Sequence, residues 1–150
     1  MMKPSRSPDA LATLIPASLC SAVLLALAMP GRIGWWPLLF VALVPLLLVV
    51  LSARPGRAAL AGFVFGLAYH LALLYWILIV LGQYGGLPIW ISLPALFLLA
   101  AYMSLYPAVF CWLLGRVAGR SWHRERSIAP LVWYAPVIWV GLEYAKSVAF

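Results

Sequence analysis

Five long apolar runs, joined by short connections, make up most of this 150-residue chain. They cover residues 11–29, 35–51, 58–81, 89–114 and 128–150. A helix needs roughly 20 apolar residues to cross a bilayer's hydrocarbon core of about 30 Å. In lipid such a run must be helical, because every backbone polar group needs a partner within its own segment. The runs therefore predict five transmembrane helices.

The composition supports lipid as the solvent of this chain. Hydrophobic residues make up 67% of it and charged residues 9%, whereas soluble domains carry roughly 45–50% and about 25%. Short connections make neighbouring helices run in opposite directions. We therefore expect an all-α membrane protein, a bundle of about five antiparallel transmembrane helices. Residues 1–10 would form a cytoplasmic tail and residues 11–150 the transmembrane domain.

The positive residues predict the orientation of this bundle. If the helices alternate, two basic residues, Arg32 and Lys146, lie on one side and eight on the other. Those eight are Lys3, Arg6, Arg54, Arg57, Arg116, Arg120, Arg124 and Arg126. Because Lys and Arg favour the cytoplasmic side, the N-terminus is predicted there and Phe150 near the outer face. The net charge of +7 then reflects topology, and we expect no nucleic acid partner.

An alternative reading makes the first run a cleaved signal peptide. It has a charged start, and residues 26–28 read Ala-Leu-Ala, which resembles a cleavage site. The run is long for a signal sequence, and the alternating charge pattern requires it to stay in the protein.

Small residues and prolines inside the runs predict how the helices pack. Gly62 and Gly66 form a GxxxG pair, which lets helices approach closely. We expect it to serve packing within the chain rather than dimerisation. Prolines inside the runs are expected to bend their helices. They are Pro16, Pro37, Pro45, Pro94, Pro107 and Pro136.

Glu143 is the leading polar candidate, because an ionisable residue in a membrane helix is a functional hypothesis by default. Lys146 follows three residues later on the same face. The pair either satisfies itself and anchors the outer end of the helix, or guides a substrate headgroup or docks an outer domain.

The remaining chemistry is sparse. Asp9, Glu125 and Glu143 are the only acids, so a paired-carboxylate mechanism has no candidates. Cys20 and Cys111 form no CxxC or Cys/His cluster and are expected to be buried. We predict no metal site, no cofactor and no catalytic residue in this chain.

Several motifs together resemble bacterial apolipoprotein N-acyltransferase over about residues 24–150. They are Gly62-Phe-Val-Phe-Gly66, Tyr75-Trp76, Tyr84-Gly85-Gly86-Leu87-Pro88, Ala100-Ala-Tyr102-Met-Ser-Leu-Tyr106 and Ala135-Pro136-Val-Ile-Trp139, followed by Glu143 and Lys146. The resemblance implies a bacterial inner-membrane enzyme with eight transmembrane helices and a nitrilase-like outer domain. A Glu-Lys-Cys triad on that domain would take an acyl chain from a phospholipid and pass it to the N-terminal diacylglyceryl-cysteine of an apolipoprotein.

No member of that triad matches a position here. Cys111 lies toward the cytoplasmic side, and Glu143 corresponds to a helix glutamate of the family. The resemblance thus implies the N-terminal membrane segment of the enzyme, inactive by itself, as a fragment, truncated gene or split subunit. Candidate residues for a substrate path or for docking the missing domain are Trp76, Tyr84, Gly85, Gly86, Tyr102, Tyr106, Glu143 and Lys146. The alternative is a stand-alone small multi-pass membrane protein, either a transporter or an assembly factor.

Overall fold

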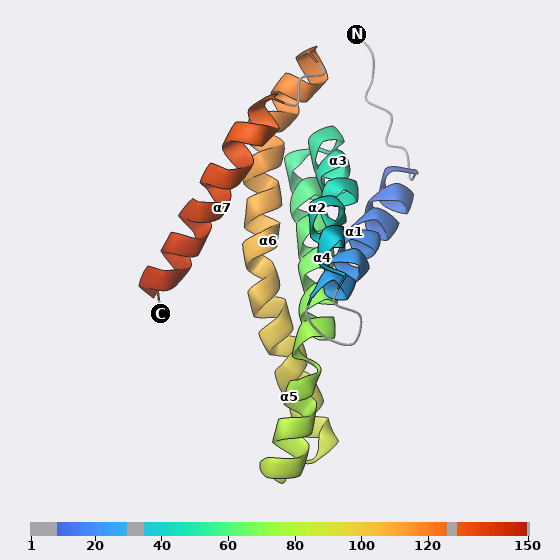
Figure 1. The fold of residues 1–150 in the computed structure, drawn as a ribbon, viewed down its shortest axis with the longest axis vertical. Helices are drawn as coiled ribbons and strands as arrows, with labels where there is room; N and C mark the ends of the chain where they lie inside the picture. Colours follow the sequence, from blue (N-terminus) through green and yellow to red (C-terminus); the bar gives the residue numbers. More distant parts are fainter. Residues whose placement is uncertain (1–8, 30–34, 126–128, 150) are drawn as a thin grey trace.

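Helices make up all the regular secondary structure of residues 9–29, 35–125 and 129–149, the part described by a computed structural model (Figure 1). The α-helices are α1 (Asp9–Ala28), α2 (Leu39–Ala42), α3 (Val44–Ser52), α4 (Pro55–Leu74), α5 (Trp76–Ile79), α6 (Ile89–Glu125) and α7 (Ala129–Ala149). A 3₁₀ turn, η1 (Trp36–Leu38), precedes α2, and a π-helical turn, η2 (Val80–Tyr84), follows α5. The prediction of an all-α fold is confirmed for these residues.

Two of the described helices are long and apolar enough to cross a membrane. They span Pro55–Leu74 and Ile89–Val117, and two shorter apolar stretches cover Ala12–Ala28 and Trp36–Ser52. The length and the apolar composition of these helices agree with a helical membrane protein.

The closest helix packing joins α4 to α6, which returns beside it (Figure 1). A Cβ on Gly62 would overlap the carbonyl oxygen of Pro107, and one on Gly66 would lie 2.6 Å from Pro107 Cγ. Near the other end of the contact, a Cβ on Gly115 would lie 3.0 Å from Ala58 Cβ. A side chain at Gly62 or Gly66 would force Pro107 to shift, so the GxxxG pair serves packing within the chain, as predicted.

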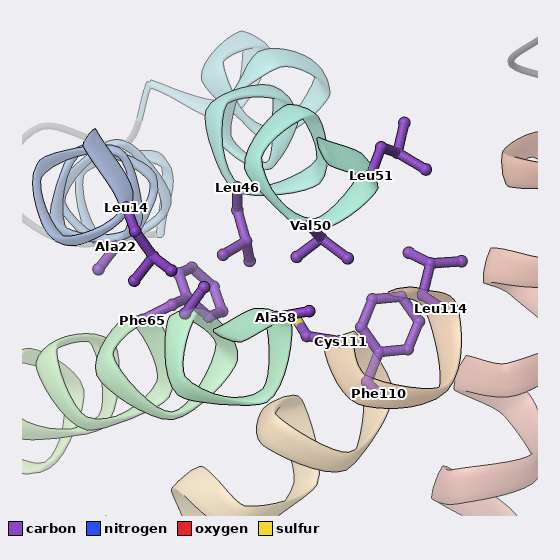
Figure 2. Close-up of a cluster of buried hydrophobic side chains, with 11 residues drawn as sticks. Leu14, Ala22, Leu46, Val50, Leu51, Ala58, Phe65, Phe110, Cys111 and Leu114 are labelled. Atoms are coloured by element: carbon purple, nitrogen blue, oxygen red, sulfur yellow. The ribbon is translucent and has the colours of Figure 1, made fainter. Parts of the chain in front are cut away.

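A buried apolar cluster lies where α1, α3 and α6 meet α4 (Figure 2). Leu14 of α1, Leu46 and Val50 of α3, and Phe65 of α4 point toward one another in its centre. Dispersion contacts between such close-packed side chains hold helices together where lipid supplies no hydrophobic force between them.

The second apolar run is not one continuous helix. It breaks at Leu43, two residues before Pro45, so that α2 ends and α3 begins again. Pro45 has no backbone N–H and cannot continue the hydrogen-bond ladder. Across the interface, the Ser21 hydroxyl of α1 accepts a 3.0 Å hydrogen bond from the backbone N–H of Leu46. The serine therefore caps α3 from another helix and fixes α1 against the break.

Two further helices differ from the predicted bounds. The run predicted to begin at Ala58 starts earlier, as α4 at Pro55. It is interrupted at Tyr75 and continues through the short α-helix α5 into the π-helical turn η2. In contrast, α6 continues to Glu125, where residues 115–127 were predicted to form a polar connection. That stretch holds good helix formers such as arginine and alanine and has no proline to stop the helix.

The two cysteines have different surroundings. Cys111 is fully buried, with its sulfur 2.8 Å from the position that a Cβ on Gly62 would take. Cys20 is exposed on α1, so the prediction that it is buried is wrong. It points away from the buried face of α1 that carries Leu14 and Ser21.

We expect Gly62→Ala to destabilise the protein, because its methyl group collides with the backbone of Pro107. Overpacking of this kind typically costs about 1–3 kcal/mol. Gly141→Ala on α7 is the matched control, since nothing lies within 4 Å of its added Cβ. Thermal unfolding of the purified protein in detergent measures both. Equal unfolding temperatures for the two variants would show that α4 and α6 are not in close contact at Gly62.

Candidate functional site

The segment from α5 to the start of α6 forms an uncharged, aromatic tip (Figure 1). Trp76 is 51% exposed and Tyr84 is 83% exposed. The chain reverses after η2 through Gly85 and Gly86, and Gly86 adopts a φ of 62°. Glycine accepts this left-handed conformation without a Cβ clash. We call residues 75–90 the aromatic tip.

The aromatic tip extends beyond the ends of the neighbouring helices (Figure 1). From Pro55 to Tyr84 the helical path is about 45 Å long at 1.5 Å per residue, whereas α1 extends about 30 Å. The hairpin of α4 and α6 is therefore longer than a bilayer core of about 30 Å. Tryptophan and tyrosine prefer the interface between hydrocarbon and water, and the tip carries both in Trp76 and Tyr84.

Two tyrosines form a polar pair on α6. The hydroxyls of Tyr102 and Tyr106 lie 3.3 Å apart, and their rings meet edge to face with centroids 6.1 Å apart. Four residues separate them, so they occupy successive turns on one face of the helix. The pair places two hydroxyl groups on a partly exposed surface of an otherwise apolar stretch.

Glu143 lies on α7, one turn beyond the contact that this helix makes with α6. The rings of Phe110 and Trp139 meet edge to face, 5.4 Å between centroids. Because α6 and α7 run in opposite directions (Figure 1), one turn from that contact puts Tyr106 and Glu143 at the same level. Glu143 is exposed, and the side chain of Lys146 is outside the described part. We call Tyr102, Tyr106 and Glu143 the polar group of α6 and α7.

The predicted site residues therefore separate into two places. Trp76, Tyr84, Gly85 and Gly86 belong to the aromatic tip. Tyr102 lies about 20 Å along α6 from Ile89, where the tip joins that helix. The sequence alone did not indicate this division, because it depends on how far α6 extends and on how α7 packs.

Other buried polar groups bond within the helices. His70 Nδ1 lies 2.7 Å from the carbonyl oxygen of Gly66 on the preceding turn. The Ser104 hydroxyl donates to the carbonyl of Ala100. Ser21 is the polar residue that sequence reasoning missed. It contacts Leu46, the residue after Pro45, and this contact joins two separate apolar runs, so neither run predicts it by itself. Among the described residues, no three His, Cys, Asp or Glu side chains group closely enough to hold a metal ion.

Comparisons with known proteins agree on one family. The family model for the apolipoprotein N-acyltransferase N-terminal domain matches residues 21–150. The chain is 43% identical to an apolipoprotein N-acyltransferase of Geobacter metallireducens over 127 residues, which are 85% of this chain and 23% of the relative. It is 36% identical to the same enzyme of Chromobacterium violaceum over 121 residues, 80% of this chain and 23% of that relative. The chain thus spans about a quarter of the length of these relatives.

Proposed function

Because this chain belongs to the family of the apolipoprotein N-acyltransferase N-terminal domain, we propose that it is the membrane-embedded N-terminal part of such an enzyme. The enzyme transfers an acyl chain from a membrane phospholipid to the N-terminal diacylglyceryl-cysteine of a bacterial apolipoprotein. The observation that carries this proposal is the family match over residues 21–150, joined to an all-helical fold with apolar spans.

We assign the covalent chemistry to the nitrilase-like domain of the enzyme rather than to this chain. Acyl transfer through a thioester needs a reachable thiolate beside a base. Cys111 is fully buried against the α4 backbone at Gly62, so an acyl ester has no path to its sulfur. This chain would hold the outer domain and admit the lipid, and by itself it would not transfer acyl groups.

The proposed topology has five antiparallel transmembrane segments in the bacterial inner membrane. α1, the segment from η1 to α3, the segment from α4 to η2, α6 and α7 cross in turn, with residues 1–10 as a cytoplasmic tail. Lys and Arg gather at one end of these segments, which favours the cytoplasm for that end. The aromatic tip then lies at the outer face.

This topology predicts which positions react with a thiol reagent that cannot cross the membrane. In a chain with Cys20 and Cys111 replaced by alanine, Tyr84→Cys should be labelled in intact spheroplasts. Arg54→Cys should be labelled only after the membrane is opened. Labelling of Arg54→Cys and not Tyr84→Cys in intact spheroplasts would reverse the proposed orientation.

A chimeric enzyme tests the function. The full chain replaces the matching segment of the Geobacter metallireducens relative, with which it shares 43% identity. The chimera is expressed in bacteria whose own apolipoprotein N-acyltransferase is depleted. We expect it to restore N-acylated lipoproteins, observed as a third acyl chain by mass spectrometry of their N-terminal peptides.

Two controls frame that result. The relative without its N-terminal segment should give no N-acylation, and the 150-residue chain by itself should give none. A chimera that is inserted and stable but leaves lipoproteins with two acyl chains would contradict the proposed function. Acylation by the chain alone would contradict the assignment of the chemistry to another domain.

We assign two tasks to the two groups of candidate residues. The aromatic tip, with Trp76, Tyr84, Gly85 and Gly86, is the surface that docks the outer domain. The polar group of α6 and α7 belongs to the substrate path, where hydroxyl and carboxylate groups guide a phospholipid headgroup. Its position supports this, because Glu143 and the tyrosine pair share one level on adjacent helices. Lys146, three residues beyond Glu143, belongs to the same path.

Variants of the chimera test the polar group. Glu143→Gln and Tyr106→Phe should each lower the rate of N-acylation about three- to tenfold, the range expected from polar contacts between membrane helices. Tyr144→Phe is the matched control, because Tyr144 is 71% exposed on α7 beside Glu143. An equal loss in Tyr144→Phe, or no loss in the other two at unchanged protein level, would remove the polar group from the substrate path.

A further inference from the structure

The end of α6 carries arginine at every fourth residue. α6 continues to Glu125, past the last residue of its apolar run at Leu114. Arg116, Arg120 and Arg124 lie on this continuation, and positions four apart share one face of a helix. The backbone therefore aligns three arginine positions in one stripe, about 12 Å long at 1.5 Å per residue.

Two more arginines lie beside the start of this stripe. A Cβ on Gly115 would lie 3.0 Å from Ala58 Cβ and 3.7 Å from the Cα of Pro55. The first turn of α4 is thus in contact with α6 one residue before Arg116. Arg54 and Arg57 flank that turn, Arg54 exposed and Arg57 half-buried. Packing of two helices brings arginines from different parts of the sequence to one end of the hairpin.

The ring of Trp112 indicates where along the apolar span this arginine cluster begins. The guanidinium carbon of Arg116 lies 4.3 Å from the centroid of the Trp112 ring, a cation–π contact. Trp112 is one turn inside the apolar run, and tryptophan prefers the bilayer interface. In the topology proposed above, this contact falls at the border between hydrocarbon and water, which is where phospholipid headgroups lie.

Arginines outnumber acidic residues in this part of the sequence. The chain has three acids, and none lies between Asp9 and Glu125. Glu125 alone neighbours the stripe in sequence, whereas five arginines occupy α6 and the start of α4. Guanidinium groups present paired N–H donors that match the oxygens of a phosphate. A cluster in which arginines outnumber acids, next to an apolar span, is a pattern that favours anionic lipid.

From this placement we propose a binding site for the headgroups of anionic phospholipids at the end of the α4–α6 hairpin opposite the aromatic tip. It consists of Arg54, Arg57, Arg116, Arg120 and Arg124. Its ligand is a phosphodiester carrying net negative charge, in the leaflet that meets this end. The proposal rests on the membrane topology proposed above, and it adds a lipid contact in the cytoplasmic leaflet. The continuity of the stripe with an apolar span favours lipid over a soluble polyanion such as RNA.

Native mass spectrometry of the full chain in detergent tests the site. The purified, delipidated protein is titrated with phosphatidylglycerol or with phosphatidylethanolamine, and the bound lipid is counted. We expect tighter binding of phosphatidylglycerol. The triple variant R116Q/R120Q/R124Q should bind it about a hundredfold more weakly, since each cation near an anionic surface contributes about fivefold. Binding of phosphatidylethanolamine should not change.

The matched control is R116K/R120K/R124K, which keeps the charge and should keep most of the preference. Circular dichroism and gel filtration check the fold of each variant. If the triple glutamine variant unfolds, Arg120→Gln alone should weaken phosphatidylglycerol binding about fivefold. The preference should fall as salt rises, because ions screen exposed charges.

Three outcomes would overturn the proposal. These are equal binding of the two lipids by the unchanged protein, a full preference in folded glutamine variants, and displacement of the lipid by an equal concentration of free glycerol phosphate or of a short RNA. The measurement needs no acyl transfer. A chimera without activity would therefore leave the lipid site standing, and loss of the lipid preference would leave the proposed function standing.

Discussion

The contact between α4 and α6 at their glycines is the constraint on which the rest of the structure depends. In a lipid environment, burial of apolar side chains gives helices little reason to associate, and close backbone approach must supply the attraction. Gly62 and Gly66 bring α4 onto Pro107, and Gly115 brings α6 onto Ala58. These contacts bury Cys111 and provide the surface on which α1 and α3 pack (Figure 2).

Features that act along one helix could be predicted from the sequence. The apolar runs indicate helices because lipid leaves the backbone no other partner, and the GxxxG spacing indicates a close contact. Contacts between helices could not be read in this way. The break at Leu43 is stabilised by the Ser21 hydroxyl, which accepts a hydrogen bond from Leu46, 25 residues away in the chain. The exposure of Cys20 likewise depends on which face of α1 packs against the other helices, and the composition of the run does not specify that face.

The candidate residues show the same limit. Tyr102 and Tyr106 are four residues apart, so their contact follows from helix geometry. The alignment of Glu143 with Tyr106 follows instead from the ring contact of Phe110 with Trp139, which sets how far α7 slides along α6. The spacing of residues in the sequence does not determine how far α7 is shifted along α6. The end of α6 was misjudged for a different reason, because polar residues predict contact with water and do not by themselves predict a loop.

Charge explains why the two ends of the hairpin differ in chemistry. No Asp, Glu, Lys or Arg occurs from residue 58 to residue 115, so the aromatic tip has none of these charged side chains to bury at a membrane interface. The opposite end carries five arginines beside a tryptophan and cannot move inward, because a guanidinium at the bilayer centre costs about 2.5–3.5 kcal/mol or more. A hairpin longer than the bilayer core must place its excess length somewhere. In the topology proposed above, arginine holds one end of the hairpin at the interface, so the excess length falls at the end that carries the aromatic tip.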